Sequence, residues 1–257
     1  MNVRTTRPMG FGPFSRSAVD IIVPFHSQYE KVYDLIRSIV IAVKSNPYQI
    51  TLVDDCSENE EFGKDINKEF EKSTPQGMRP QVRCIKSASQ LGFGGALKLG
   101  FESTTSPWVM FMHSDCVVED PNFMINMGRS LLEWKKEGVP VKMVSASSNN
   151  PDEFKDLCSE GKDKILKDAT MPMFCCLCNR ALFGYVGGFI KSYPFAWYED
   201  EEFSHRMKKH GLLQGVCARA RIRHHGGSTI KYLWDTRPET KKEMEANRER
   251  CISDMKN

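Results

Sequence analysis

Three polar residues, His113, Ser114 and Asp115, interrupt the apolar run FMHSDCVV at residues 111–118. A chain avoids burying a carboxylate unless the charge is paired or binds a ligand. Asp115 is therefore predicted to lie at the end of a strand or in a site, with the histidine and the serine beside it. The run raises the question of what this carboxylate holds.

Polar residues also end two earlier apolar runs. VDIIVPF runs into a cluster at 24–27, and YQITLVDD ends on a pair of aspartates, Asp54 and Asp55, in a cluster at 54–57. Ligands of open α/β sheets collect at the carboxyl ends of the strands. The three polar clusters are therefore predicted to share one crevice.

The segment GFGG places Gly92, Gly94 and Gly95 where a helix is predicted to begin. Small residues and free backbone amides at such a place allow a phosphate or a sugar to approach closely. The G-x-G-x-x-G spacing of a dinucleotide site is absent, because position 97 is leucine. A Rossmann dehydrogenase is therefore disfavoured.

Short apolar strands alternate with amphipathic helices in the first half of the chain. Strands are predicted at 19–25, 48–55, 81–87 and 107–115, and helices at 29–45, 60–72 and 95–104. Strands that are apolar on both faces indicate a parallel sheet covered by helices on both sides. The predicted fold class is α/β, a single domain with a mostly parallel central sheet flanked by helices.

The pattern changes after residue 120. A helix is predicted at 121–138 and a strand at 141–147, and the polar stretch at 149–168 that follows is interpreted as a loop. A later helix is predicted at 201–210, with Gly211 as its C-terminal signal. Residues 1–17 are predicted to be a flexible lead, 18–230 the domain, and 231–257 a polar helix or tail. This tail could pack, become ordered at a partner or fray.

The chain has 36 basic and 33 acidic residues, a formal net charge of +3. This balance is too mild to predict nucleic acid as a partner. Basic residues gather between Arg206 and His225. They suit an anion such as a diphosphate, although a solvated surface is the more common outcome for such a run.

The nine cysteines are not spaced as a disulfide framework, and the start of the chain lacks the apolar segment of a secretory signal. No apolar run reaches transmembrane length. We therefore expect a reducing, cytoplasmic setting. Cys175 and Cys178 have C-x-x-C spacing, but no second pair follows, so buried thiols are expected rather than zinc ligands.

Six motifs follow one another in an informative order: IIVPFHS, VDDCS, QLGFGGALKLG, FMHSDCVV, GGFIKSYPFAWYEDEEFSHRMKKHG and HHGGST. Together they resemble the family 2 glycosyltransferases of the GT-A fold, which transfer sugars from nucleoside diphosphates with inversion. The resemblance covers roughly residues 19 to 230. It implies a nucleotide-binding half at 18–118 and an acceptor-binding half at 119–230.

The resemblance implies a nucleotide site at the ends of the first strands. Asp55 matches the family's base-binding aspartate, and Pro24 and Phe25 are expected to form the wall of the base slot. The other expected nucleotide contacts are Gly92, Gly94, Gly95 and Ser114. Without the other motifs, Asp54 and Asp55 would be interpreted as caps of a following helix.

The resemblance also implies a divalent cation, which would stabilise the charge of the leaving diphosphate. The family usually places Asp-x-Asp after the fourth strand, whereas this chain has His113-Ser114-Asp115. The implied ligands of Mn²⁺ or Mg²⁺ are Asp115, His113 and His224. Imidazole is softer than carboxylate, so the identity of the metal and the need for it stay open. The alternatives for His113 are a sugar contact or a satisfied core histidine.

An inverting transfer needs a base that takes the proton of the acceptor hydroxyl. WYEDEEF matches the family's Glu-Asp motif, which implies Asp200 as this base and Glu199 as a supporting acceptor contact. Trp197 and Tyr198 are expected to contact the acceptor, although aromatic residues more often pack in a core. The acidic run also suits a helix N-terminus.

The predicted function is an inverting, metal-assisted glycosyltransferase with a nucleoside-diphosphate sugar as donor and a glycan or lipid-linked acceptor. The alternative is a catalytically silent nucleotide-sugar or carbohydrate binding protein of the same fold. A nucleotidyltransferase ranks last, because the first strand-helix loop lacks a basic signature. The single carboxylate base argues against a glycoside hydrolase. Donor sugar, linkage, oligomeric state and a peripheral membrane contact stay open.

Overall fold

The computed structural model describes residues 19–43, 48–73, 81–148, 161–167, 169–189, 193 and 195–256. Over these residues the chain forms one α/β domain around a nine-stranded sheet. The strands are β1 (Val19–Phe25), β2 (Tyr48–Asp54), β3 (Gln81–Lys86), β4 (Trp108–Met112), β5 (Cys116–Val118), β6 (Val141–Ser148), β7 (Lys164–Leu166), β8 (Cys175–Asn179) and β9 (Leu213–His224).

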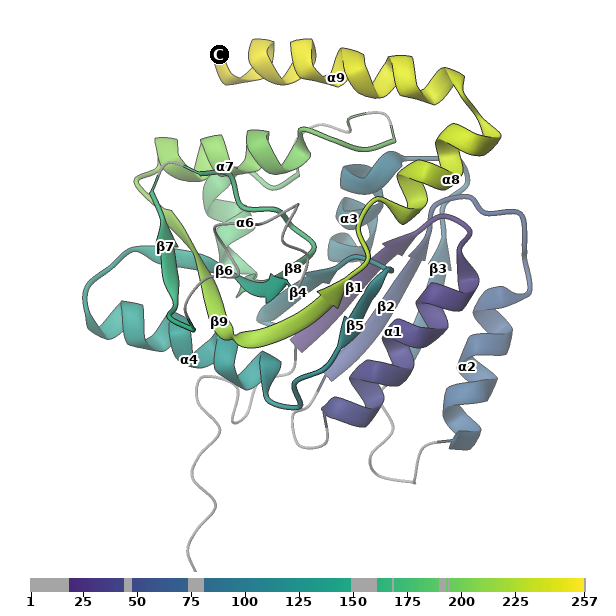
Figure 1. Ribbon diagram of the computed structural model, residues 1–257, viewed down its shortest axis with the longest axis horizontal. Coiled ribbons are helices and arrows are strands. Elements are labelled where there is room, and N and C mark those ends of the chain that lie inside the picture. Colours follow the sequence, from purple (N-terminus) through teal and green to yellow (C-terminus); the bar gives the residue numbers. More distant parts are fainter. Residues whose placement is uncertain are drawn as a thin grey trace, which may run out of the picture.

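Across the sheet the strands follow the order β3-β2-β1-β4-β8-β6-β9-β5, and β7 pairs with β9 off this path (Figure 1). The first four strands are parallel to one another. β8 is antiparallel to both β4 and β6, so β6 and its parallel neighbour β9 point the same way as the first four. Only β5, β7 and β8 run against this direction. The predicted α/β fold with a mostly parallel sheet is confirmed.

Helices cover both faces of the sheet (Figure 1). They are α1 (Tyr29–Ala42), α2 (Phe62–Ser73), α3 (Gly92–Glu102), α4 (Phe123–Lys136), α6 (Ala181–Val186), α7 (Glu199–Lys209), α8 (Ser228–Thr236) and α9 (Glu239–Lys256). Because side chains alternate along a strand, β1 serves two cores. Its residues Val19, Ile21 and Val23 pack with α1, α2 and α4, whereas Ile22 packs with α3, α6 and α7. These two cores explain the apolar character of both strand faces.

The run at residues 111–118 is divided between two strands. β4 ends at Met112, the triplet forms a turn, and β5 begins at Cys116 and pairs antiparallel with β9. The sequence analysis did not separate this second strand, because its three residues are too few to show a period. The triplet therefore lies between the C-terminal end of β4 and the N-terminal end of β5.

The predicted loop at 149–168 contains a short strand, β7, at 164–166. The remainder of that stretch at 149–160 and residue 168 lie outside the described residues, as does the predicted lead at 1–17. The C-terminal segment packs: α9 crosses over α7 (Figure 1) and buries Met244 and Asn247 completely. No described helix is both long and apolar enough to cross a bilayer.

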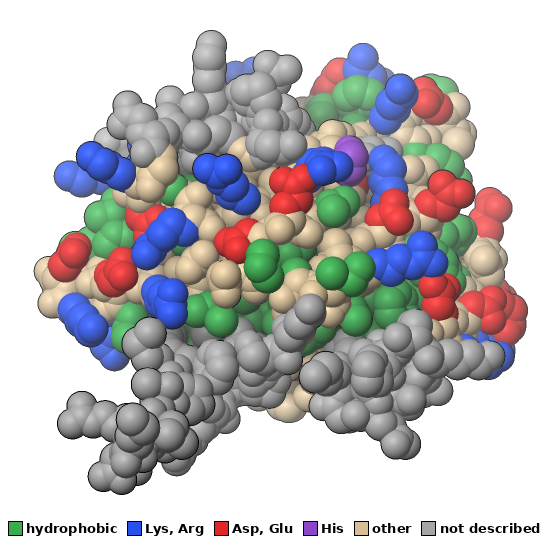
Figure 2. All heavy atoms as spheres, turned by 60° about the horizontal axis from the view of Figure 1, so that its bottom comes forward, with side chains coloured by type: hydrophobic (Ala, Val, Ile, Leu, Met, Phe, Trp, Pro, Cys, Tyr) green, Lys and Arg blue, Asp and Glu red, His purple; other side chains and the backbone are tan. Residues whose placement is uncertain are grey.

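The late basic run forms ion pairs instead of a free basic patch. The pairs are Arg206 with Glu202, Arg219 with Glu133, and Arg223 with Glu119. Basic and acidic side chains are interspersed over the face of the molecule in Figure 2. The solvated surface is therefore the better interpretation of this run.

We predict that Gly100→Ala destabilises the fold by about 1–3 kcal/mol, the usual cost of overpacking a core. A Cβ at position 100 of α3 would meet Ile22 Cγ2 at 2.4 Å and Val53 Cγ2 at 2.9 Å, both on buried strands. The measurement is the free energy of unfolding in urea.

The matched control is Gly184→Ala in α6, where an added Cβ meets nothing within 4 Å. This variant is expected to be neutral or up to about 1 kcal/mol more stable, since alanine favours a helix over glycine. Equal stability of the two variants would show that α3 does not pack against the sheet as described.

Candidate active site

A cavity of about 880 Å³ lies at the carboxyl ends of β1, β2 and β4, and α8 lines one side of it. Each of the three polar clusters contributes to its wall, through residues 24–26, Asp55 and the triplet at 113–115. The predicted common crevice is thereby confirmed. Glu199 and Asp200 at the start of α7 line the same cavity.

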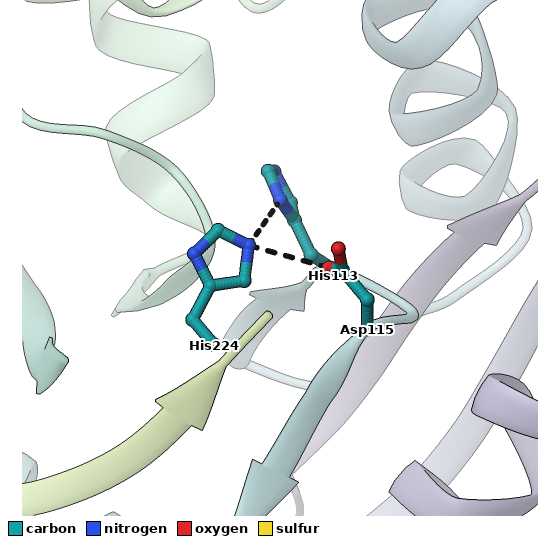
Figure 3. A group of neighbouring side chains, drawn as sticks. All are labelled: His113, Asp115 and His224. Atoms are coloured by element: carbon teal, nitrogen blue, oxygen red, sulfur yellow. Dashed lines mark hydrogen bonds and ion pairs between the residues drawn. The ribbon is translucent and has the colours of Figure 1, made fainter. Parts of the chain in front are cut away.

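His113, Asp115 and His224 meet in this cavity (Figure 3). His113 Nδ1 lies 3.1 Å from His224 Nε2, which lies 3.2 Å from Asp115 Oδ1. Antiparallel pairing of β5 with β9 places Cys116 opposite His224 and so sets the histidine beside the triplet. The side chains come from the end of β4, the turn before β5 and the end of β9, which explains why distant motifs form one cluster.

The donor set of this cluster fits a divalent cation. Two ligand atoms that are each about 2.1 Å from one ion and at right angles lie about 3.0 Å apart, close to the spacing of the two imidazole nitrogens. Burial, and then the neighbouring His224, lowers the pKa of His113 to about 3. His113 is therefore neutral near pH 7, and neutral imidazole is the form that binds metal.

Asp55 joins the end of β2 to the start of α3. Its Oδ1 accepts the backbone N–H of Leu91 at 2.6 Å, and its Oδ2 accepts that of Gly92 at 3.0 Å. Burial raises the pKa of this carboxyl. The capping alternative therefore describes part of its role, although the helix that it caps is α3 and not the next helix in the chain. Asp54 instead accepts the N–H of Ser57.

Pro24 and Phe25 line the cavity beside Asp55, and so does His26, which the sequence analysis did not select. His26 Nδ1 lies 2.8 Å from the carbonyl oxygen of Asp55, so this nitrogen carries the proton and donates it. Its position in the cluster at 24–27 was a signal that could have identified it. Ser114 also lines the cavity.

Gly92, Gly94 and Gly95 form the first turn of α3 and do not belong to the described lining of the cavity. Gly92 has φ +73°, and a Cβ there would lie 2.7 Å from the carbonyl oxygen of Tyr193. The glycine is therefore needed for close packing against the segment that leads to α7. Phe93, between the glycines, faces the cavity and packs edge-on against His113.

Asp200 lies in the N-terminal turn of α7 and is half-buried, although its Oδ1 is enclosed. Its Oδ2 accepts the N–H of Met173 at 3.1 Å, and its Oδ1 has no partner among the described residues. Burial raises the pKa of Asp200 to about 7. Burial and the charge of Asp200 raise the pKa of Glu199 well above its ordinary value, and Glu199 Oε2 also lacks a partner in the described part of the chain.

An aromatic segment leads into α7 with unusual backbone conformations. Phe195, Trp197 and Tyr198 have φ values of 66°, 77° and 75°. Left-handed conformations cost bulky residues roughly 1–3 kcal/mol each and occur mainly where surrounding structure fixes them, often at functional sites. All three residues line the cavity.

Trp234 of α8 is a cavity residue that the sequence analysis missed. Its ring lies edge-on to Trp197 with 5.6 Å between centroids, and its buried Nε1 has no partner among the described atoms. The apolar spacing of Ile230, Leu233 and Trp234 was the available signal, since it predicts a helix face. The residues that follow are mostly polar, and the whole segment at 231–257 was therefore interpreted as a polar helix or tail.

Arg219 and Arg223 do not line the cavity, although the sequence placed them beside His224. Side chains alternate along β9, so the arginines are exposed while His224 is buried. They bind acidic side chains on the outer face. The expected anion site formed by these arginines is therefore not present in the described structure.

Three solved structures have a similar fold. One is GalNAc-T7 with UDP, GalNAc and Mn²⁺, at 13% identity and a TM-score of 0.63 over 82% of this chain and 43% of that chain. A second is the mannosyltransferase PcManGT from Pyrobaculum calidifontis with GDP-Man and Mn²⁺, at 15% identity and a TM-score of 0.62 over 84% and 60%. A third is S. aureus TarS 1-349, at 13% identity and a TM-score of 0.58 over 84% and 63%.

The chain thus spans less than two thirds of each of these three proteins. A comparison with curated protein sequences gives no significant match. The described architecture is the GT-A fold. Residues 20–138 match the sequence model of glycosyl transferase family 2. The match covers the first four of the six motifs and supports the resemblance there.

We predict that the protein binds Mn²⁺ at least about tenfold more tightly than Mg²⁺, because two imidazoles and one carboxylate form a softer donor set than the oxygen ligands that Mg²⁺ prefers. Titration calorimetry with the metal salts alone measures this preference. His113→Asp introduces a second carboxylate and is expected to narrow the difference between the affinities for Mn²⁺ and Mg²⁺.

The control is His210→Ala, which removes an exposed histidine at the end of α7 and should leave both affinities unchanged. His224→Ala should weaken Mn²⁺ binding by at least about tenfold, since it removes a ligand. Equal affinities for the two ions in the unaltered protein would contradict the predicted preference.

Proposed function

We propose that the protein is an inverting glycosyltransferase that moves a sugar from a nucleoside-diphosphate sugar to a hydroxyl of a glycan or lipid-linked acceptor. The observation that carries this proposal is the carboxylate of Asp200. One of its oxygens has no partner among the described residues, its pKa is raised to about 7, and it lines the same cavity as the His-Asp-His cluster. A cation-binding cluster and a base in one cavity are what such a transfer requires.

The donor nucleotide is proposed to lie over the ends of β1 and β2. Pro24 and Phe25 would form the wall of the base slot, and Asp55 retains acceptor capacity for a base N–H, since a carboxylate has about four lone-pair sites. Ser114 lies between two residues of the His-Asp-His cluster in the chain and would contact the diphosphate. Two solved structures of similar fold hold UDP or GDP-Man by their titles, which supports a nucleotide of this kind here.

The glycines at 92, 94 and 95 are proposed to support donor binding without contacting the donor themselves. The Gly92 amide holds Asp55, and the first turn of α3 brings Phe93 and Ala96 to the cavity wall. A divalent cation bound by His113, Asp115 and His224 would neutralise the charge that develops on the diphosphate. The described part of the half at 18–118 would thus bind the donor, while His224 would complete the ligands from the second half.

Asp200 is proposed as the base that receives the proton of the acceptor hydroxyl. Its raised pKa makes it basic enough to take a proton and still ionised in part at pH 7. Glu199 would remain protonated when Asp200 ionises, because two adjacent buried carboxylates resist a double charge. Its O–H would then donate to the acceptor. Trp197 and Tyr198 would form the wall against which the acceptor packs.

We predict that Asp200→Asn lowers kcat for sugar transfer by at least about 100-fold, the lower end of what a general base contributes. Donor affinity should change less than about twofold, because the amide keeps the size of the side chain. The unaltered enzyme should gain kcat/KM about tenfold per pH unit up to a pKa of about 7 and level off above it, since only the ionised carboxylate accepts a proton. Transfer is measured as release of nucleoside diphosphate in the presence of acceptor.

The matched control is Asp235→Asn on the exposed side of α8, which should keep full activity and the same pH profile. Full transfer by Asp200→Asn would show that the base is another group. Donor binding without transfer or hydrolysis in the unaltered protein would instead favour the silent binding protein.

A further inference from the structure

One face of α9 lies on the aromatic segment that leads into α7. The residues of this face recur at spacings of four and three along the helix, the period of one helical face. They are Thr240, Met244, Asn247 and Cys251, and each is at most 1% exposed. The rest of α9 is mostly polar and exposed.

Three side chains connect α9 to the backbone or side chains of residues 193–198. Asn247 Nδ2 donates to the carbonyl oxygen of Ala196 at 2.7 Å. Cys251 Sγ lies 3.7 Å from the carbonyl oxygen of Tyr198, and the Tyr193 hydroxyl lies 3.1 Å from Asp254 Oδ2. The segment with left-handed residues is therefore held along its length by one helix.

Asn247 is itself oriented for this contact. Arg250 Nη1 donates to Asn247 Oδ1 at 2.8 Å, which leaves the amide NH₂ to face Ala196. On the other side of the segment, the N–H of Phe93 donates to the carbonyl oxygen of Phe195 at 2.8 Å. The segment thus lies between the first turn of α3 and α9.

We propose that Asn247 is a positioning residue, which holds the Ala196 carbonyl so that Trp197 and Tyr198 keep their left-handed conformations and Asp200 stays aligned in the cavity. This inference rests on the proposed function, because it concerns the same base. Asp200 lies only four residues beyond Ala196, in the first turn of α7, so a shift of the Ala196 carbonyl is passed to it over a short stretch of chain. The contact would act on the geometry of transfer and not on the binding of the donor.

The test is Asn247→Asp. The carboxylate keeps the size of the side chain and the contact with Arg250, but it replaces the donor that faces Ala196 with an acceptor. We expect kcat for transfer to fall about 10- to 100-fold, as for small misplacements of reacting groups. Donor KM and donor affinity should stay within about twofold, because the cavity wall near β1 and β2 is not altered.

A purely structural role would lower the melting temperature without changing the pH profile. Displacement of the segment would admit water to Asp200 and lower the pKa of its carboxyl. The pH at which kcat/KM rises should therefore be lower in Asn247→Asp than in the unaltered protein. Glu249→Gln, an exposed neighbour on α9, is the matched control and should show neither change. A variant with unchanged kcat and pH profile would overturn the proposal.

A second variant keeps the test decisive if Asn247→Asp unfolds. Tyr193→Phe removes one hydroxyl and its contact with Asp254, and it should shift kcat in the same direction by a smaller factor. Unchanged kcat and pH profile in this variant would also overturn the proposal. Failure of the proposed function is a separate result: Asp200→Asn would then transfer normally, whatever the Asn247 variants do.

Discussion

The two hydrogen bonds from the Asp55 carboxylate to the first amides of α3 are the contact on which the rest of the site depends. A charged acceptor at a helix N-terminus satisfies amides that have no partner within the helix and interacts favourably with the helix dipole. The bonds fix where α3 begins. They also place Gly92 against the carbonyl of Tyr193 and Phe93 against the carbonyl of Phe195.

Through these contacts the cavity wall at the end of β2 is connected to the opposite wall. The segment at 195–198 lies on α3, and α9 encloses it from the other side. The segment that precedes Asp200 is therefore packed on both sides. The strain of three left-handed aromatic residues is tolerated because packing and hydrogen bonds on both sides leave the segment few alternatives.

Hydrophobic periodicity predicted the four parallel strands and their helices well, because each strand is apolar on both faces and each helix shows a clear apolar stripe. It failed where elements are short or polar. β5 has three residues and β7 has three, and α9 buries a narrow stripe that includes Asn247 and Thr240, which no hydrophobic pattern would select. For the same reason the sequence did not predict that α9 packs on α7.

Candidate site residues that belong to the sequence motifs were selected from the sequence. Residues that only the tertiary structure brings to the cavity were missed. His113, Asp115, His224 and Asp200 share one cavity as expected, whereas Trp234 and His26 were not selected. For the arginines of β9 the sequence left open an anion site or a solvated surface. The strand decides between them, because alternate side chains along it face opposite ways and the arginines are exposed. The glycines at the start of α3 were expected at a ligand, and Gly92 instead allows two backbone segments to approach.

The cluster in Figure 3 joins positions that are 111 residues apart in the chain. An ion held between them would bind only the folded protein, because the unfolded chain would lose entropy by closing so long a loop. Because ligands that bind only the folded state also stabilise it by mass action, the edge formed by β5 and β9 would gain stability from the ion. The cellular supply of that ion would then influence how long the protein persists as well as how fast it works.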